Sequence, residues 1–490
     1  TLNLGLRWEY ESPRTERYDR TTRGFGFGVP SPLRVPGLNL TGGLLYAGVG
    51  GADRGIYAPD RNNFAPRIGF AFSLNQKTAL RGGYALSYIP VIGSVTSDGY
   101  SNNTPWVPSL DGGLTIVNRL SNPFPSGLVP AIGNSLGLAT LLGQGVTFVE
   151  PADRTPKFHN WHFDIQRELP GSTVVEIAYV GSRGISLIAP NEQLNQVFPS
   201  QFGLGAALKQ QVENPMFGLL TSGPLSGRTV PREQLLRPYP QFTGVSRANP
   251  AFGNSVYHSL QIKLEKRLAQ GLAALISFTA SKNLSDLNGR RDAFSRSVER
   301  AVSDSDVPQR LTIAASYDLP FGRNRKYLSN IGRAADFAIG GWQLSTFQTY
   351  QAGFALGFGF AGGTYPAGTS PRPLVVGDPT FGVSGSHQSR LDRYFNTDAF
   401  VRPPDFTLGN LAPRLHTVRS PGMNNINITL FKNFFVTEKV RTEFRASAYN
   451  ALNHPVFSGP NTTVGNASFG RISSQANLSR QIEFGLRVSF

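Results

Sequence analysis

The stretch PRIGFAFSLNQKTALRGGYALSY, residues 66–88, alternates large apolar side chains with small or polar ones. Successive side chains of a strand point to opposite faces, so a period of two predicts a β-hairpin with one apolar face and a turn at residues 75–78. The apolar side chains of this pattern are Ile68, Phe70, Phe72, Leu74, Leu80, Tyr84, Leu86 and Tyr88.

The same design recurs along the chain, which makes it an internal repeat. The further hairpins span residues 161–179, 258–278 and 425–449, with turns near residues 171, 270 and 437. Single alternating segments lie at residues 2–10, 310–319, 341–351 and 481–490. Together these segments predict about twelve strands.

The connections alternate between short turns and long segments. The long connections are expected at residues 11–65, 89–158, 182–256, 282–309, 352–423 and roughly 452–480, with 320–340 of intermediate length. Outer-membrane barrels have short periplasmic turns and long extracellular loops, and a tilted strand of about ten residues spans their apolar band of about 25 Å. The sequence therefore predicts an all-β, transmembrane antiparallel β-barrel with long extracellular loops. A soluble β-sandwich or propeller is the alternative.

Composition limits the chemistry available. The 490 residues include no cysteine, which excludes disulfides, thiol nucleophiles and Cys-ligated metals. The net charge of +16 comes from scattered Arg and Lys without basic runs, so we expect no nucleic-acid partner. The chain starts inside an alternating pattern at Thr1 with no signal peptide, and it is expected to be the C-terminal portion of a longer protein.

The alternation assigns one face of each strand to lipid and the other to a polar lumen. The charged residues predicted to face the lumen are Arg7, Arg81, Asp164, Glu176, Lys263, Glu265, Arg441, Glu443, Arg445, Glu483 and Arg487, with Glu9, Glu168, Arg310 and Asp318 beside them. Because this set is nearly neutral, the excess positive charge belongs to loops and turns. Loop arginines could pair with lipopolysaccharide phosphates or an anionic ligand, or be simply solvated.

The chain ends in QIEFGLRVSF, residues 481–490, with strict alternation and a terminal aromatic residue. This terminus resembles the signal by which the barrel assembly machinery recognises outer-membrane substrates. The resemblance implies recognition of Ile482, Phe484, Leu486, Val488 and Phe490.

Further stretches resemble the barrel of TonB-dependent receptors, in particular the Oar-like subfamily, which carries a carboxypeptidase-regulatory-like domain ahead of its plug. They include NLGLRWEY (3–10), PDRNNFAPRIGFAF (59–72), EIAYVGSRG (176–184), YHSLQIKLEKRL (257–268), DLPFGRNRKYL (318–328), GGWQLSTFQTYQAG (340–353) and FRASAYNALNHPVF (444–457). The resemblance implies a 22-stranded barrel of a Gram-negative outer membrane, filled by a plug and energised by TonB. Residues 1–490 are then expected to be the C-terminal part of that barrel, without the plug.

The resemblance implies a receptor and transporter for TonB-dependent ligand uptake, with loops that bind the ligand and a lumen that conducts it. One alternative is a structural or adhesive barrel that binds surfaces or partners without import, and a second is a soluble all-β carbohydrate-binding or hydrolytic protein. No nucleophile, base and orienting group stand at plausible spacing, so we expect neither enzymatic activity nor a cofactor. The ligand is not indicated.

Several isolated motifs receive ordinary structural interpretations. Gly357, Gly359 and Gly362 match a phosphate-binding pattern but lack a following helix, which favours a flexible loop. His159 and His162 would lie on opposite faces of a strand and could not share a metal. The pair Asp304 and Asp306 has too few acids for a calcium site and is interpreted as part of a solvated loop. A solvated loop is also expected for the mixed-charge residues, with a ligand-contact surface as the alternative: Asp286, Arg290, Arg291, Asp292, Arg296, Glu299 and Arg300.

Overall fold

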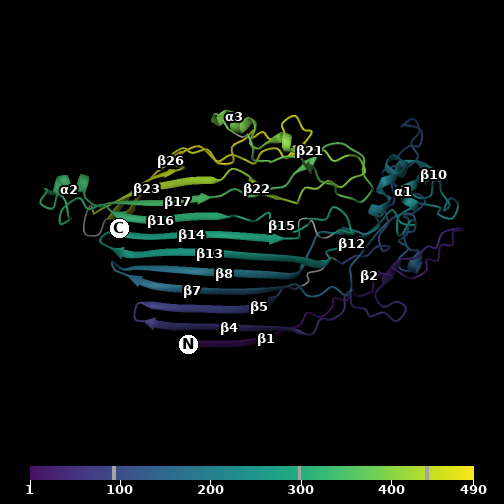
Figure 1. Cartoon of the computed structure of the whole chain (residues 1–490), viewed down its shortest axis with the longest axis horizontal. Coiled ribbons are helices and arrows are strands. Elements are labelled where there is room, and N and C mark those ends of the chain that lie inside the picture. The colour runs from purple at the N-terminus through teal and green to yellow at the C-terminus, as the bar shows by residue number, and fades with distance from the viewer. Residues whose placement is uncertain (91–94, 288, 296–298, 383, 436–440) are drawn as a thin grey trace.

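The computed structural model describes residues 1–90, 95–287, 289–295, 299–382, 384–435 and 441–490. One large antiparallel sheet dominates it, in which each strand pairs with the next long strand along the chain (Figure 1). Its twelve consecutive strands are β1 (Leu2–Glu9), β4 (Asn63–Asn75), β5 (Thr78–Tyr88), β7 (Lys157–Leu169), β8 (Thr173–Ile188), β13 (Ala251–Ala269), β14 (Leu272–Ser285), β16 (Gln309–Asp318), β17 (Trp342–Gln351), β23 (Met423–Phe435), β24 (Arg441–Tyr449) and β26 (Gln481–Ser489). The prediction of about twelve antiparallel strands is confirmed.

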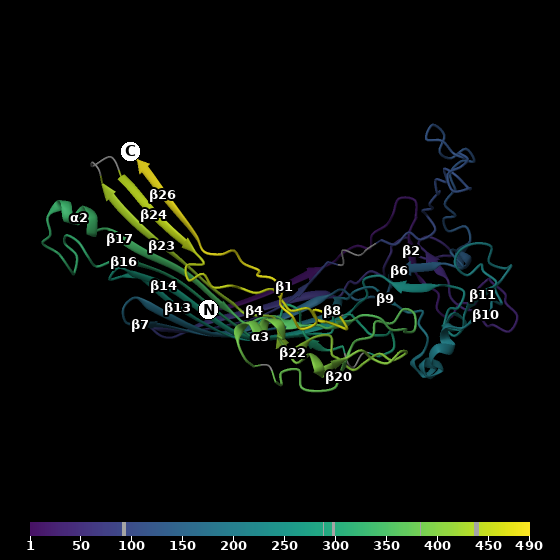
Figure 2. The same cartoon turned by 90° about the horizontal axis from the view of Figure 1, so that it is seen from above.

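The sheet is a curved, open wall rather than a closed cylinder. In the described part of the chain β1 pairs only with β4, and β26 only with β24, so these two strands form its edges. Figure 2 shows the wall bending into a trough. An open sheet leaves unpaired backbone groups along β1 and β26, which a barrel would satisfy by closure.

Short turns gather at one end of the wall, called the turn end (left in Figure 1). Between β13 and β14, Gln270 and Gly271 both have positive φ, at 55° and 79°. Two such residues form the type of turn whose twist matches that of a β-hairpin. The predicted turn near residue 437 lies outside the described residues. The connection 319–341 is longer and contains helix α2 (Arg333–Ile339).

Several strands extend further than the sequence indicated, β8 and β13 by the largest number of residues. The long connection was expected at residues 182–256, but β8 continues to Ile188 and β13 begins at Ala251. In the added part of β8, residues 182–188, Ile185 and Leu187 alternate with the small residues Gly184 and Ser186, and this alternation is shorter than in the predicted hairpins. Backbone pairing between β8 and β13 holds these extensions together.

The opposite end of the wall carries a folded layer, here called the loop cap: the described residues within 10–62, 89–156, 189–250, 286–308, 352–422 and 450–480. Its strands are β2 (Thr22–Phe25), β3 (Leu44–Tyr46), β6 (Gly145–Phe148), β9 (Glu192–Gln193), β10 (Gln211–Glu213), β11 (Thr229–Pro231), β12 (Gly244–Arg247), β15 (Ala301–Val302), β18 (Ala355–Leu356), β19 (Gly359–Phe360), β20 (Leu374–Val375), β21 (Phe400–Val401), β22 (Leu415–Arg419) and β25 (Thr463–Val464). Its helices are α1 (Arg232–Leu235), α3 (His387–Asp392) and the 3₁₀ segments η1 (Gly137–Ala139), η2 (Pro199–Lys209) and η3 (Thr397–Ala399).

The main apolar clusters of the described chain lie in the loop cap rather than on the wall. One cluster joins Phe25, Phe148 and Phe242, which come from three successive long connections. A second joins Phe358, Phe395 and other residues of the connection after β17 with Val464. Burial of large aromatic side chains contributes much of the stability of such clusters. No helix in the described part of the chain is long and apolar enough to cross a membrane.

Candidate functional site

The strand register gathers the charged candidates on one face of the wall. Directly paired residues of neighbouring strands share a face. Arg81 pairs with Asp164, and Glu176 with Lys263. Following the pairs from β1 to β26 places all eleven predicted lumen residues on the same face, and Glu9, Glu168, Arg310 and Asp318 with them. We call this the charged face.

Ion pairs on the charged face are partly exposed. Lys263 Nζ lies 3.2 Å from Glu265 Oε2, and Arg445 Nη2 lies 3.3 Å from Glu483 Oε1. All four side chains are about half exposed, so these pairs add little stability and remain accessible to water or a passing solute.

The opposite face is apolar, and we call it the apolar face. Ile482, Phe484, Leu486 and Val488 of β26 lie on it, and Phe484 is 71% exposed. Phe490, the remaining residue of the predicted assembly signal, follows the end of β26 and is fully exposed. The separation of apolar from charged side chains is incomplete, since Leu275 and Phe347 lie on the charged face. Exposed apolar rows of this kind need a cover such as lipid.

Part of the mixed-charge stretch is buried. The interpretation as a solvated loop is wrong for Arg291, Asp292 and Glu299, whereas Arg300 is exposed. Glu299 is 2% exposed and its carboxylate pairs with Arg372 at 2.5 Å and with Arg291 at 3.7 Å. Burial lowers the pKa of Arg372, while its hydrogen bond to Glu299 opposes this. The pair ties the connection after β14 to the connection after β17. Arg296 lies outside the described residues.

Asp306 is also buried rather than solvated, at 1% exposure. Its carboxylate accepts a hydrogen bond from the Asn283 backbone at 2.6 Å and pairs with Arg419 at 2.7 Å. The carboxylate is therefore committed to protein groups. Over the residues that the structure describes, no cluster of His, Asp and Glu could hold a metal ion.

The structure also shows where the two histidines and the glycine-rich segment lie. His159 lies on the apolar face, where its ring nitrogen is 2.8 Å from the Tyr84 hydroxyl, and His162 lies on the charged face. The two histidines are on opposite faces as predicted. The glycine-rich segment contributes the short strands β18 and β19 on either side of the buried Phe358, and Gly362 follows them in an exposed segment.

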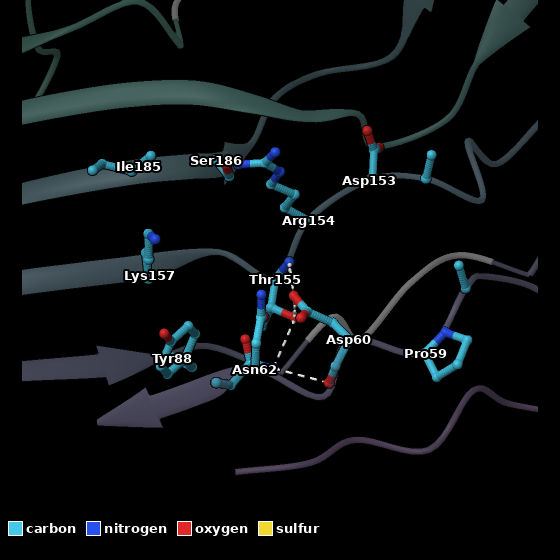
Figure 3. A pocket seen from close by; sticks show the side chains of 13 residues that line it. Pro59, Asp60, Asn62, Tyr88, Asp153, Arg154, Thr155, Lys157, Ile185 and Ser186 are labelled. Atoms are coloured by element: carbon cyan, nitrogen blue, oxygen red, sulfur yellow. Dashed lines mark hydrogen bonds between the residues drawn. The ribbon is translucent and has the colours of Figure 1, made fainter. Parts of the chain in front are cut away.

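A polar cavity of about 370 Å³ lies at the loop-cap end of β4, β5, β7 and β8 (Figure 3). Asp60 accepts hydrogen bonds from the Thr155 hydroxyl at 2.9 Å and from its backbone N–H at 3.3 Å. Asp153 lines the cavity and accepts from the Ala251 backbone at 2.9 Å, and burial raises its pKa.

The cavity also presents cationic side chains. Arg154 and Lys157 line it, so groups of both signs surround one space. Such a lining suits a polar or zwitterionic ligand. Sequence reasoning missed this cavity because Asp60 and Thr155 are 95 residues apart and belong to different connections.

The long wall, its charged and apolar faces and the cap at one end define a membrane-spanning β-barrel domain. A family model described as an outer membrane beta barrel domain matches residues 1–483. The chain belongs to this family, and its place is the outer membrane. The turn end then faces the periplasm and the loop cap is extracellular.

Among solved structures the similarity is distant. The outer membrane transporter YddB from Escherichia coli is 11% identical with a TM-score of 0.38, covering 87% of this chain and 40% of its own. The ferripyoverdine receptor of Pseudomonas aeruginosa is 9% identical with a TM-score of 0.37, covering 89% and 34%. The FrpB iron transporter from Neisseria meningitidis is 10% identical with a TM-score of 0.37, covering 88% and 39%. The chain thus spans well under half the length of these proteins. No curated protein matches it significantly.

Proposed function

We propose that residues 1–490 are the C-terminal portion of the barrel of a TonB-dependent receptor of the Oar-like type, which takes up a ligand across the outer membrane. The observation that carries this proposal is the segregation of fifteen charged side chains onto one face of a wall whose other face is mostly apolar. A barrel closed from such a wall has a polar lumen that can conduct a solute.

The loop cap supports a receptor role. Its buried clusters and the pairs made by Glu299 and Asp306 hold the long connections in one arrangement. A rigid surface binds a ligand without a large ordering cost. The cavity beside Asp60 and Asp153 is our candidate for ligand contact.

The remaining partners follow from this assignment. TonB would act through the plug, which these residues do not include. Loop arginines would contact lipopolysaccharide or the ligand, and the sequence of β26 would engage the barrel assembly machinery during insertion.

Uptake by cells that produce the full-length protein tests the proposal. Radiolabelled ferric siderophores, oligosaccharides and peptides would be offered to cells with and without TonB. At least one label should accumulate only when both proteins are present. A substitution of Asp153→Ala should weaken capture, whereas Asp398→Ala at an exposed position should not. Equal accumulation without TonB would rule out energised uptake.

One observation favours the adhesive alternative. Residues 101–132 project from the loop cap (dark blue in Figure 2) and expose Leu110, Leu114 and Leu120 at 79% or more. Exposed apolar patches often mark sites of interaction with other molecules. If deletion of residues 104–130 abolished cell attachment while uptake remained undetectable, the adhesive function would replace the receptor function.

A further inference from the structure

The connection between β16 and β17, residues 319–341, differs from the other described turns at the periplasmic end because it is a folded unit. The Leu319 N–H donates to the Trp342 carbonyl at 2.8 Å, and the Tyr327 N–H donates to the Pro320 carbonyl at 2.9 Å. The Asp336 carboxylate accepts from the Arg323 backbone at 2.6 Å. The last of these bonds ties α2 to the segment before it.

Helix α2 is fastened to the apolar face of the wall. Trp342 pairs directly with Lys432, and Lys432 with Phe444, in a row that continues to Leu486 of the apolar face. The last turn of α2 receives two donors from this row. The Trp342 indole N–H donates to the Ala338 carbonyl at 3.0 Å, and the Lys432 ammonium donates to the same carbonyl at 3.0 Å.

Lys432 would be costly on a lipid-facing surface without such partners. Its ammonium also donates to the Gly340 carbonyl at 2.8 Å and lies 4.7 Å from the centre of the Trp342 ring. The residue is only 6% exposed. The Lys432 ammonium therefore binds the carbonyl groups at the end of α2 and does not contact lipid.

The outer surface of this unit is apolar and continues the apolar face beyond the ends of the strands. Phe337 packs against Phe434 with ring centres 5.0 Å apart, yet remains 55% exposed. Ile339, at the end of α2, is 42% exposed. Phe321, Tyr327 and Leu328 of the same connection are also exposed.

The unit is strongly cationic. Its basic residues are Arg323, Arg325, Lys326 and Arg333, all exposed, and its acidic residue is Asp336. No salt bridge involves these four cations within the described residues, and the Asp336 carboxylate already accepts from a backbone N–H. Exposed apolar side chains beside cations that form no salt bridge are typical of segments that lie in a membrane interface and attract anionic lipids.

We propose that residues 319–341 form an interfacial anchor that binds anionic phospholipid of the periplasmic leaflet. Phe337 and Ile339 contact the acyl chains next to the barrel, and the four cations contact lipid phosphates. This anchor is independent of ligand uptake, because it lies on the outside of the wall at the end opposite to the loop cap.

Spin labels measure the depth of the anchor in the full-length protein, reconstituted in phospholipid vesicles. The described chain contains no cysteine, so Ile339→Cys carries a single label within it. Phe484→Cys provides the lipid-exposed reference, and Gln76→Cys, in the exposed turn between β4 and β5, the water-exposed one. The Ile339→Cys label should collide with oxygen rather than with a water-soluble nickel chelate, as the Phe484→Cys label does. A label that behaves like Gln76→Cys would overturn the proposal.

Lipid composition tests the role of the cations. Each cation near an anionic surface strengthens attraction by about fivefold, so the Ile339→Cys label should lie deeper in vesicles that contain phosphatidylglycerol than in phosphatidylcholine alone. Replacing Arg323, Arg325, Lys326 and Arg333 by Gln should abolish this difference. The same depth in both vesicles for the parent chain would overturn the proposal. A Phe484→Cys label in the quadruple variant shows that the variant is folded and inserted.

Discussion

The indole ring of Trp161 lies over Gly181, the residue directly opposite to it on β8, and a β-carbon at Gly181 would overlap the ring. Both residues lie on the apolar face near the loop cap. Phe70 covers Gly82 in the same way between β4 and β5. Aromatic rings thus cover strand glycines that would otherwise expose backbone.

Replacing Gly181 by Ala should destabilise the wall, because the indole must leave its position over β8. Overpacking of this kind costs about 1–3 kcal/mol. Gly69→Ala is the matched control, since its β-carbon would meet only a carbonyl oxygen at 3.9 Å. The urea midpoint of unfolding in vesicles, followed by tryptophan fluorescence, is measured for both variants. Equal midpoints for the two variants would contradict this account.

Glu299→Gln should loosen the loop cap. The change leaves the buried Arg372 and Arg291 without a countercharge, and breaking a buried pair costs about 3–5 kcal/mol. Amide hydrogen exchange near Arg372 should accelerate. Asp398→Asn breaks the exposed pair with Arg393 and should change exchange little. Unchanged protection in Glu299→Gln would show that the pair does not hold the two connections together.

Asp98 should make loop-cap stability depend on pH. Burial raises the pKa of Asp98, while the hydrogen bond from the Thr147 N–H opposes this. A raised pKa in the folded state means that the cap is more stable in acid and loses that stability as the pH rises through the raised pKa. Asp98→Asn should therefore be more stable than the parent at neutral pH and equal to it below the ordinary aspartate pKa. Melting monitored by tyrosine fluorescence across pH tests this.

Asp111 provides a control, because the pH dependence of its contribution to stability is expected to have the opposite sign to that of Asp98. Hydrogen bonds from Ser109 and Thr115 lower its pKa to about 2. Its local structure should weaken as the pH falls through that value, and Asp111→Asn should remove the effect. If stability changed with pH in the same direction for both aspartates, burial would not explain the behaviour of Asp98.

Lys432→Met should release α2 from the wall. The Gly340 carbonyl loses its ammonium donor, and an unsatisfied buried group costs about 1–3 kcal/mol. A spin label at Ile339→Cys should become more mobile. Lys77→Met, in an exposed turn, is the control and should leave the label unchanged. An immobile label in Lys432→Met would mean that Trp342 and Phe337 suffice to hold the helix.

The wall could be predicted from sequence because its signal is local and repeated. Alternation over about ten residues fixes both the strand and the face of each side chain, so Arg81 and Asp164 were assigned to one side before their pairing was known. The observed register pairs residues of the same predicted face with one another from strand to strand, so the faces assigned from the sequence are kept across the sheet. Lys432 was not anticipated, because its partners on α2 are more than 90 residues away.

The loop cap could not be predicted in the same way. Its strands, such as β9 and β18, are too short for a periodic pattern. Its buried charges pair across long separations: Glu299 and Arg372 are 73 residues apart. Locally, acids among arginines are typical of a solvated surface, and only the tertiary fold shows which of them are enclosed.

The contacts that hold the loop cap together have a consequence for biogenesis. The Gln241 side chain donates to the Thr41 carbonyl at 2.7 Å across 200 residues of sequence, and Gln196 bonds to Gly368 across 172. Closing such separations early carries a large entropy cost, and these contacts span several strands of the wall. The connections joined by these contacts are therefore expected to complete their mutual packing only after the strands between them have formed.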